Sequence, residues 1–238
     1  MDRQAAIILL ENTFNNNFEL LRFSQLIKEI FNRFDTKEKS YKPWKEFEKF
    51  IKEYSSLGSF VDKDNRHIEV LTVNLIKTSS RDRARTMQRN FVAKFLRNYD
   101  KDAALVAFYG DDPTDWRFSF VKMEYDLEKG QILTPARRYS YLVGKNEPNH
   151  TAKQQLLEVL IEERFEPTLE LIEEAFSIEK VTQDFFNEYK ELYFQLKESL
   201  DELIEKNHRI KREFEKKYIG TEDFSKKLLG QVVFLYFL

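Results

Sequence analysis

The segment that most restricts the fold is residues 67–77, HIEVLTVNLIK, which reads as a β-strand with apolar side chains on both faces. Successive side chains of a strand point to opposite sides, so Ile68 and Val70 share one face while Leu71 and Val73 share the other. A strand that is apolar on both faces is typical of the centre of a sheet covered on both sides. The sequence therefore predicts a sheet with a further layer on each face.

Other strand-like segments surround this one. Residues 57–61 precede it across a polar turn, which predicts a β-hairpin. Residues 80–96 follow it and repeat apolar side chains at spacings of three and four, the period of an amphipathic helix. Further β-rich runs then span residues 103–110, 116–127 and 136–144. The order strand, strand, helix and three strands predicts a mixed sheet in an α+β fold with α/β-like character.

Helical periodicity dominates both ends of the chain. Residues 1–56 include Pro43, which suits the first turn of a helix, and we expect them to form a helical lead-in packed on the core. Residues 57–150 then form the mixed-sheet domain, and residues 151–238 a helical connector. The sequence stops in the apolar run VVFLYFL, and since chain ends are usually polar, we expect the connector to continue into a longer protein.

Composition excludes several kinds of site. The 238 residues contain no cysteine, so disulfides and thiolate metal sites are excluded. The three histidines are scattered without a metal-binding spacing, and no glycine-rich phosphate loop is present. The net charge of -2 gives no global attraction to nucleic acid, so any such binding needs a local patch. Neither a signal peptide nor a membrane-spanning segment is evident, which predicts a cytoplasmic protein without a membrane partner.

One such patch lies on the predicted helix over residues 80–96. Its arginines recur at spacings of four and therefore share a stripe beside the apolar one. The residues expected to contact DNA are Arg81, Arg85, Gln88 and Arg89. The arginines would neutralise phosphates, and Gln88 would reach a base edge or a sugar. Alternatively, the arginines pair with acids such as Glu69 or Asp112 and hold the sheet together.

Carboxylates and a lysine around the central strand suggest a metal-dependent nuclease. Asp62 and Asp64 lie at the hairpin turn, Glu69 opens the strand, and Lys77 closes it on the same face. Magnesium needs converging oxygen ligands, and a lysine near the attacking water assists hydrolysis. This layout is similar to that of PD-(D/E)xK nucleases, although Leu75 stands where that signature has an acid.

A second group of candidates lies further along the chain. Asp112 and Asp115 fall in a turn, and Lys122 and Glu124 follow on the next predicted strand. The order there is Lys-x-Glu, the reverse of the nuclease signature. Acids in turns and a lysine at a strand end are also common solvated features.

Several phrases resemble a known family. They include DWRFSFVKMEY, LTPARRYSYLVGKNEPNHTAKQQL and KLLGQVVFLYFL, within a likeness that covers most of residues 57–238. Together they resemble the N-terminal part of bacterial type IIG, or type IIS, restriction-modification enzymes. The resemblance implies a PD-(D/E)xK-like nuclease module and a helical connector to an adenine-specific DNA methyltransferase. The S-adenosylmethionine site would belong to that missing C-terminal part, and only Glu69 and Lys77 carry over as nuclease residues.

These observations leave three hypotheses about function. In the first, the chain is a Mg²⁺-dependent endonuclease module acting on double-stranded DNA, with Asp62 or Asp64 and Glu69 holding the metal and Lys77 polarising water. Replacing Glu69 by alanine would then abolish nicking. In the second, a degenerate, non-catalytic nuclease fold only binds DNA or supports the methyltransferase. In the third, the chain is a protein-interaction scaffold.

Overall fold

The computed structural model describes residues 1–76, 81–110, 114–123, 136–161 and 167–236, except for the side chains of 81–84, 178–180 and 236. The chain divides into two compact units, Met1–Ser177 and Ile178–Leu238. In the part of the chain that the structure describes, no helix combines the length and apolar character needed to cross a membrane.

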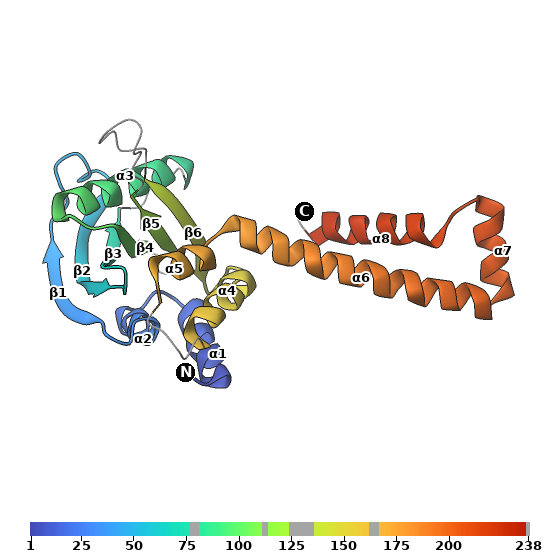
Figure 1. Ribbon diagram of the computed structural model, residues 1–238. Coiled ribbons are helices and arrows are strands. Elements are labelled where there is room, and N and C mark those ends of the chain that lie inside the picture. The colour runs from blue at the N-terminus through green and yellow to red at the C-terminus, as the bar shows by residue number, and fades with distance from the viewer. Residues whose placement is uncertain (77–80, 111–113, 124–135, 162–166, 237–238) are drawn as a thin grey trace, which may run out of the picture. The chain divides into compact units, whose positions relative to one another are not determined.

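The first unit is built on a mixed sheet of six strands, which lie side by side in chain order (Figure 1). Their bounds are β1 Asp35–Tyr41, β2 Ile51–Val61, β3 His67–Leu75, β4 Ala103–Gly110, β5 Asp115–Lys122 and β6 Arg137–Gly144. The pairing of β3 with β4 is parallel, and the other four pairings are antiparallel. The predicted mixed sheet and α+β class are therefore confirmed.

Strand β3 is central, as its two apolar faces predicted. Ile68 and Val70 belong to the buried cluster on one side of the sheet, whereas Leu71 and Val73 belong to the cluster on the other side. The parallel pairing of β3 with β4 requires a crossover, and α3 (Arg81–Tyr99) provides it. Both apolar faces of β3 are thus covered by separate layers.

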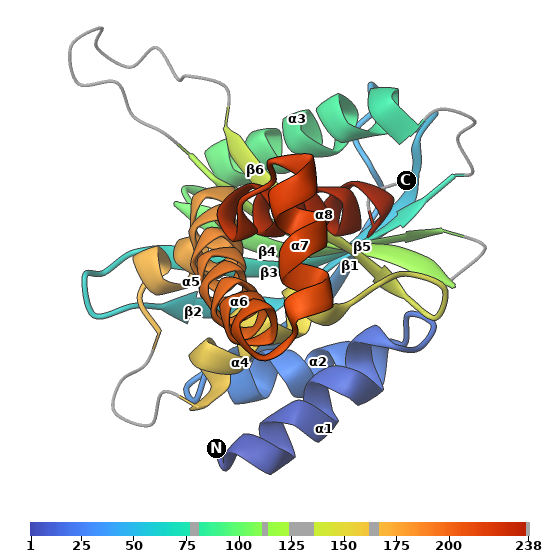
Figure 2. The same ribbon diagram turned by 90° about the vertical axis from the view of Figure 1, so that its right-hand side faces the viewer.

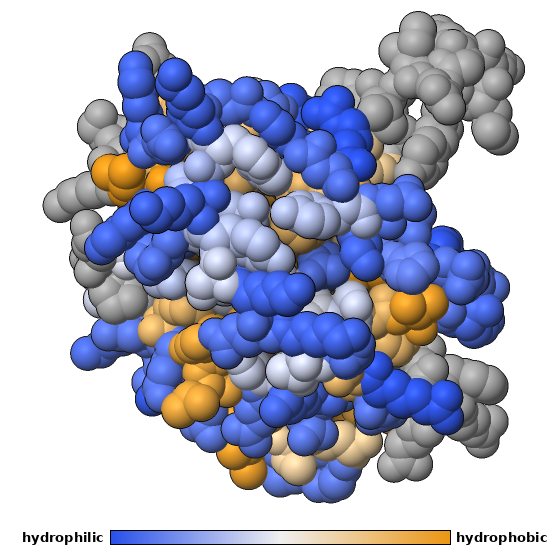
Figure 3. Space-filling view, turned by 90° about the vertical axis from the view of Figure 1, so that its left-hand side faces the viewer, coloured by the Kyte–Doolittle hydropathy of each residue, from blue (hydrophilic) through white to orange (hydrophobic). Residues whose placement is uncertain are grey.

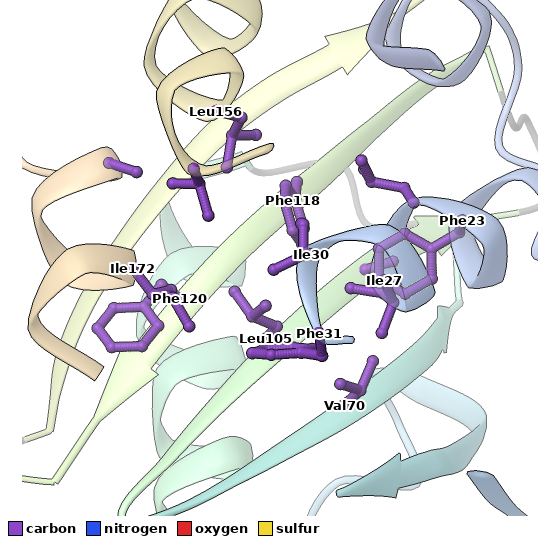
Figure 4. Close-up of a cluster of buried hydrophobic side chains, with 14 of the residues drawn as sticks. Phe23, Ile27, Ile30, Phe31, Val70, Leu105, Phe118, Phe120, Leu156 and Ile172 are labelled. Atoms are coloured by element: carbon purple, nitrogen blue, oxygen red, sulfur yellow. The ribbon is translucent and has the colours of Figure 1, made fainter. Parts of the chain in front are cut away.

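Helices cover the two faces unequally, as Figures 1 and 2 show. One face carries α1 (Arg3–Phe14), α2 (Leu20–Ile30), α4 (His150–Ile161) and α5 (Leu169–Ala175). The other face carries α3. On the four-helix side, Phe23 and Ile27 of α2 meet Val70, Leu105 and Phe118 of the sheet (Figure 4). This cluster forms the larger of the two buried cores.

The expectation that residues 1–56 are helical is wrong for their second half. Residues 35–41 form β1 and residues 51–56 belong to β2, so the expected boundary at residue 57 falls inside a strand. The apolar side chains of Ile51 and Tyr54 are buried, but against Phe91 and its neighbours on the α3 side of the sheet. Their spacing of three fitted a helix, and burial in the sheet overrode that local pattern.

Strand β1 forms one edge of the sheet. Six of its seven residues are exposed, and charged side chains alternate along it from Asp35 to Lys39. The space-filling view of this side of the molecule is mostly hydrophilic, with small separate hydrophobic areas (Figure 3). Charges on an edge strand oppose pairing with another chain, so this edge is protected against aggregation.

The expected connector over residues 151–238 is helical in the described residues, but the expected boundary at residue 151 is wrong, because α4 and α5 pack on the sheet of the first unit and the second unit begins at Ile178. The second unit contains α6 (Ile178–Lys206), α7 (His208–Lys217) and α8 (Thr221–Tyr236), with α8 packed along α6. The side chain of Asn207 caps α7 by accepting hydrogen bonds from backbone N–H groups. Asp201 of α6 accepts a hydrogen bond from Thr221 at 2.7 Å, which links the two long helices.

Candidate functional site

Asp62 is the best-anchored acid among the predicted metal ligands. It directly follows β2 and begins the turn between β2 and β3. Its Oδ1 accepts hydrogen bonds from the backbone N–H groups of Asp64 and Arg66, both at 2.9 Å. Its Oδ2 accepts from the backbone N–H of Leu169, at the start of α5, at 3.1 Å. Burial alone would raise the pKa of Asp62, but these hydrogen bonds and Arg66 outweigh it and lower that pKa. Asp62 therefore joins the turn to α5.

Arg66 brings the neighbouring acids together. Oxygens of Asp62, Asp64 and Glu170 lie within 4.8 Å of one another, an arrangement that resembles a cation site. The Arg66 Nη2 lies 2.8 Å from Asp62 Oδ2 and 3.0 Å from Asp64 Oδ2, and the guanidinium also pairs with Glu170. A guanidinium already neutralises these carboxylates and competes with a metal for them, so this group does not fit Mg²⁺.

Glu69 lies apart from that group, on the α3 side of the sheet. Its carboxylate accepts a hydrogen bond from Ser56 and lies 3.8 Å from the Lys101 Nζ. Burial raises its pKa, although Ser56 and Lys101 favour the charged form. Because residues 68 and 69 of a strand face opposite ways, Glu69 points away from the side on which Asp62 meets α5.

The predicted catalytic set is therefore not assembled in the described residues. Asp62 and Asp64 converge with Glu170, whose contribution the sequence did not suggest, rather than with Glu69. Lys77 lies outside the described residues. Among the described side chains, Lys101 rather than an arginine lies beside Glu69, and Asp112, the other acid expected to pair with the arginines, lies outside the described residues.

Glu69 gives the protein a testable pH dependence. A carboxyl whose pKa is raised by folding stabilises the protein below its unfolded pKa, and that contribution is lost as pH rises through the folded value. Replacing Glu69 by glutamine should therefore become more favourable, relative to the wild type, as pH rises from about 4 to about 7. Thermal unfolding of both proteins across this range measures the difference. A difference that stays constant or shrinks with rising pH would contradict the assignment.

The second group of acids is also dispersed. Lys122 pairs with Glu173 at 2.6 Å, an ion pair between β5 and the end of α5. Asp115 starts β5 opposite Gly144 of β6. Asp112 and Glu124 lie outside the described residues. Lys122 therefore has a structural partner on the four-helix side of the sheet.

The basic helix α3 is present as predicted, and its polar residues differ in exposure. Arg85 is exposed and Arg89 half-buried, whereas Gln88 is only 1% exposed. The expectation that Gln88 reaches a base edge is therefore wrong, because this position turns inward with Phe91 toward the sheet. The side chain of Arg81 lies outside the described residues.

Two arginines of the sheet, Arg117 of β5 and Arg138 of β6, lie close to Arg85 and Arg89 of α3. Arg138 of β6 donates from Nη1 to the carbonyl oxygen of Arg85 at 3.1 Å and from Nη2 to Ser140 Oγ at 3.0 Å. Its guanidinium lies 5.9 Å from the centre of the Phe108 ring. Burial, together with the charges of Arg117, Arg85 and Arg89, lowers the pKa of Arg138 to about 10. We call Arg85, Arg89, Arg117 and Arg138 the arginine cluster.

The strands of the arginine cluster carry a signal that sequence reasoning missed. In β5, Trp116, Phe118 and Phe120 enter the larger core, so Arg117 and Ser119 between them face α3. Polar residues at three alternate positions, Asp115, Arg117 and Ser119, mark a polar face along most of this strand. This alternation in the sequence could have indicated that the polar face of β5 lies against the arginines of α3.

Comparison of the chain with protein-family models, with curated proteins and with solved structures finds no match. The geometry of the arginine cluster and of the acidic groups is therefore the basis for assigning a function.

Proposed function

We propose that the first unit binds double-stranded DNA through the arginine cluster. The observation that carries this proposal is that arginines of α3, β5 and β6 lie together: Arg138 donates to the carbonyl oxygen of Arg85, and burial, with the charges of the other three arginines, lowers the pKa of Arg138. Like charges held together in a region of low dielectric favour an anion as their partner. Guanidinium groups bind phosphate oxygens well because their donors form a planar fork.

The local character of the arginine cluster fits the charge of the whole chain. With a net charge of -2, the protein has no general attraction to a polyanion. The arginines come from three elements, α3, β5 and β6, so the fold itself positions them. An arrangement of this kind can hold a phosphate backbone in a fixed place, which scattered surface lysines do not.

The acidic groups favour the non-catalytic alternative within this proposal. Arg66 neutralises Asp62, Asp64 and Glu170, and Glu69 lies with Lys101 on the other side of the sheet. We therefore propose a DNA-binding module of the nuclease-like kind, serving a restriction-modification enzyme in the cytoplasm. Its methyltransferase domain, with S-adenosylmethionine, would be the second partner.

The salt dependence of DNA binding tests the proposal. Each phosphate contact that is lost should reduce the slope of log K against log salt by about 0.9. We expect Arg89→Gln and Arg117→Gln each to lower this slope and the affinity for a short duplex. Fluorescence anisotropy between about 50 and 200 mM salt measures both quantities.

Arg97→Gln is the matched control for these variants. Arg97 lies in the last turn of α3, outside the arginine cluster, and its Nε donates to the carbonyl oxygen of Ala93. This variant should bind DNA like the wild type. Absence of binding at the lowest salt concentration, or an equal loss in Arg97→Gln, would refute the proposal.

A plasmid-nicking assay separates the non-catalytic module from the nuclease. Because Arg66 already pairs with Asp62, Asp64 and Glu170, we expect the protein to bind supercoiled plasmid without nicking it when Mg²⁺ is added. Gel-shift and nicking measurements on the same samples show both properties. Nicking that requires Mg²⁺ and disappears in Glu69→Ala would instead support the endonuclease.

A further inference from the structure

Several buried polar atoms around the arginine cluster have no hydrogen-bond partner among the described residues. They are Gln88 Oε1, Arg89 Nε, Ser119 Oγ and Arg138 Nε. Gln88 is 1% exposed and Ser119 is fully buried. Buried polar groups are nearly always paired in folded proteins, so several unpaired ones in one layer require an explanation.

The contacts of Arg138 show that these atoms lie close together, between α3 and the strands β5 and β6. Ser119 of β5 stands opposite Ser140 of β6, whose Oγ accepts from Arg138. Arg138 also donates to the carbonyl oxygen of Arg85, one helical turn before Gln88 and Arg89. The layer between α3 and strands β5 and β6 is therefore polar, whereas the neighbouring part of α3, around Phe91, rests on an apolar core.

The geometry points to a subsite in this layer for one terminal phosphate group of a nucleic-acid strand, held by Arg89 and Arg138 with Ser119. This inference rests on the proposed DNA binding and specifies which part of the nucleic acid the arginine cluster recognises.

The chemistry of the donors favours phosphate. Guanidinium N–H groups and a serine hydroxyl donate hydrogen bonds, and a phosphate offers several strong acceptor oxygens to receive them. The acid Asp115 lies on the same face of β5, two positions before Arg117, but the four arginines outnumber it. The net charge of the place therefore remains positive.

Because hydrogen-bond donors such as Ser119 are buried, they favour a terminal phosphate over a phosphate within a duplex. A phosphate within a duplex carries two ester links and is held at the surface of a wide rod, where exposed side chains such as Arg85 reach it. Ser119 of β5 lies beneath α3, Gln88 lies on the side of α3 that faces the sheet, and neither extends to such a surface. A terminal phosphate has one ester link and a second negative charge, so it can bind two guanidinium groups more strongly than a phosphate within the duplex.

The test compares duplexes of one sequence that end in a 5′-phosphate, a 3′-phosphate or hydroxyl groups only. Anisotropy of an internal label reports the affinity of the full chain for each. We expect one phosphorylated end to bind about tenfold more tightly than the hydroxyl end. Inorganic phosphate should compete away this preference before it displaces the hydroxyl-ended duplex. The two phosphorylated duplexes identify which strand end is recognised.

Ser119→Ala is the decisive variant because it keeps the charge and nearly the volume of a fully buried side chain. It should lose most of the preference for the phosphorylated end while retaining affinity for the hydroxyl end. Ser55→Ala is the matched control, because its hydroxyl pairs with Ser40 near the edge of the sheet. Ser55→Ala should keep the full preference.

The outcomes separate the two proposals. Equal binding of all three duplexes, or a preference that survives in Ser119→Ala, overturns the phosphate subsite and leaves DNA binding intact. Failure to bind any duplex overturns the proposed function and the subsite with it. A preference that is lost in Ser119→Ala but kept in Ser55→Ala supports both.

Discussion

Replacing Asp62 by alanine is expected to lower the free energy of unfolding of the first unit by about 3 kcal/mol. Its side chain is fully buried, and it accepts from the backbone N–H groups of Arg66 and Leu169 and from the Arg66 guanidinium. Removing it leaves those backbone donors buried without an acceptor and loosens the attachment of α5 to the hairpin. Chemical denaturation, followed by a probe in the first unit, measures the loss.

Asp64→Ala is the control for this variant. Asp64 pairs with the same arginine, but its side chain is 54% exposed, so its removal should change stability by less than about 1 kcal/mol. The pH dependence provides a second check. The lowered pKa of Asp62 means that its contribution is present above the unfolded pKa of 3.8 and is lost as pH falls. The difference between wild type and Asp62→Ala should therefore shrink on acidification, and an unchanged difference would contradict the role given to this carboxylate.

Gly144→Ala is expected to destabilise the first unit by at least about 3 kcal/mol. Gly144 ends β6 with φ of +137°, a conformation that L-residues with a side chain rarely adopt. A Cβ at this position would lie 1.9 Å from the carbonyl oxygen of Thr114, so the backbone on one side must move. Because Gly144 pairs with Asp115, the shift would disturb the start of β5, two residues before Arg117 of the arginine cluster.

Gly110→Ala is the comparison for this prediction. Among the described residues, a Cβ at Gly110 would meet the carbonyl oxygen of Leu75 at an ordinary contact distance of 3.5 Å. This variant should unfold within about 1 kcal/mol of the wild type. Thermal and denaturant unfolding of the two variants give the contrast, and DNA binding of Gly144→Ala reports whether the arginine cluster is disturbed. Equal stability of the two variants would refute the steric argument.

Most of the sheet could be predicted because its strands carry their own pattern. Strands β3 and β4 are apolar on both faces, and β5 alternates large aromatic residues with polar ones. Strand β1 carries no such signal, since DTKEKSY is charged and exposed along most of its length. It is a strand because β2 offers it a free edge, a tertiary cause that local propensity does not record.

The acidic site was harder to predict because it depends on partners distant in sequence. Asp62 and Asp64 were expected to meet Glu69, which is close along the chain but lies on the opposite face of the sheet. The acid that does join them, Glu170, comes from α5, and Arg66 brings it there. Which cation accompanies a group of carboxylates is decided by the fold.

Only part of the arginine cluster could be predicted from the sequence. Arg85 and Arg89 could be selected from their spacing on one helix, since the helical period places them on one stripe. Arg117 and Arg138 join them only because β5 and β6 present these positions to α3. The sequence pattern predicted a basic helix face, and the topology extends it into a positively charged layer.

The bonds that fasten α1 and the hairpin turn have a consequence for the order of folding. Asn149 donates to the carbonyl oxygen of Phe14 across 135 positions, and Asp62 accepts from Leu169 across 107. The first bond cannot form until the chain has been synthesised to Asn149, just before α4, and the second cannot form until it has reached Leu169, at the start of α5. Contacts so distant in sequence delay folding because the intervening loop must close first. On the ribosome, the sheet of the first unit therefore waits for its last helices, and an incomplete chain leaves the larger core uncovered.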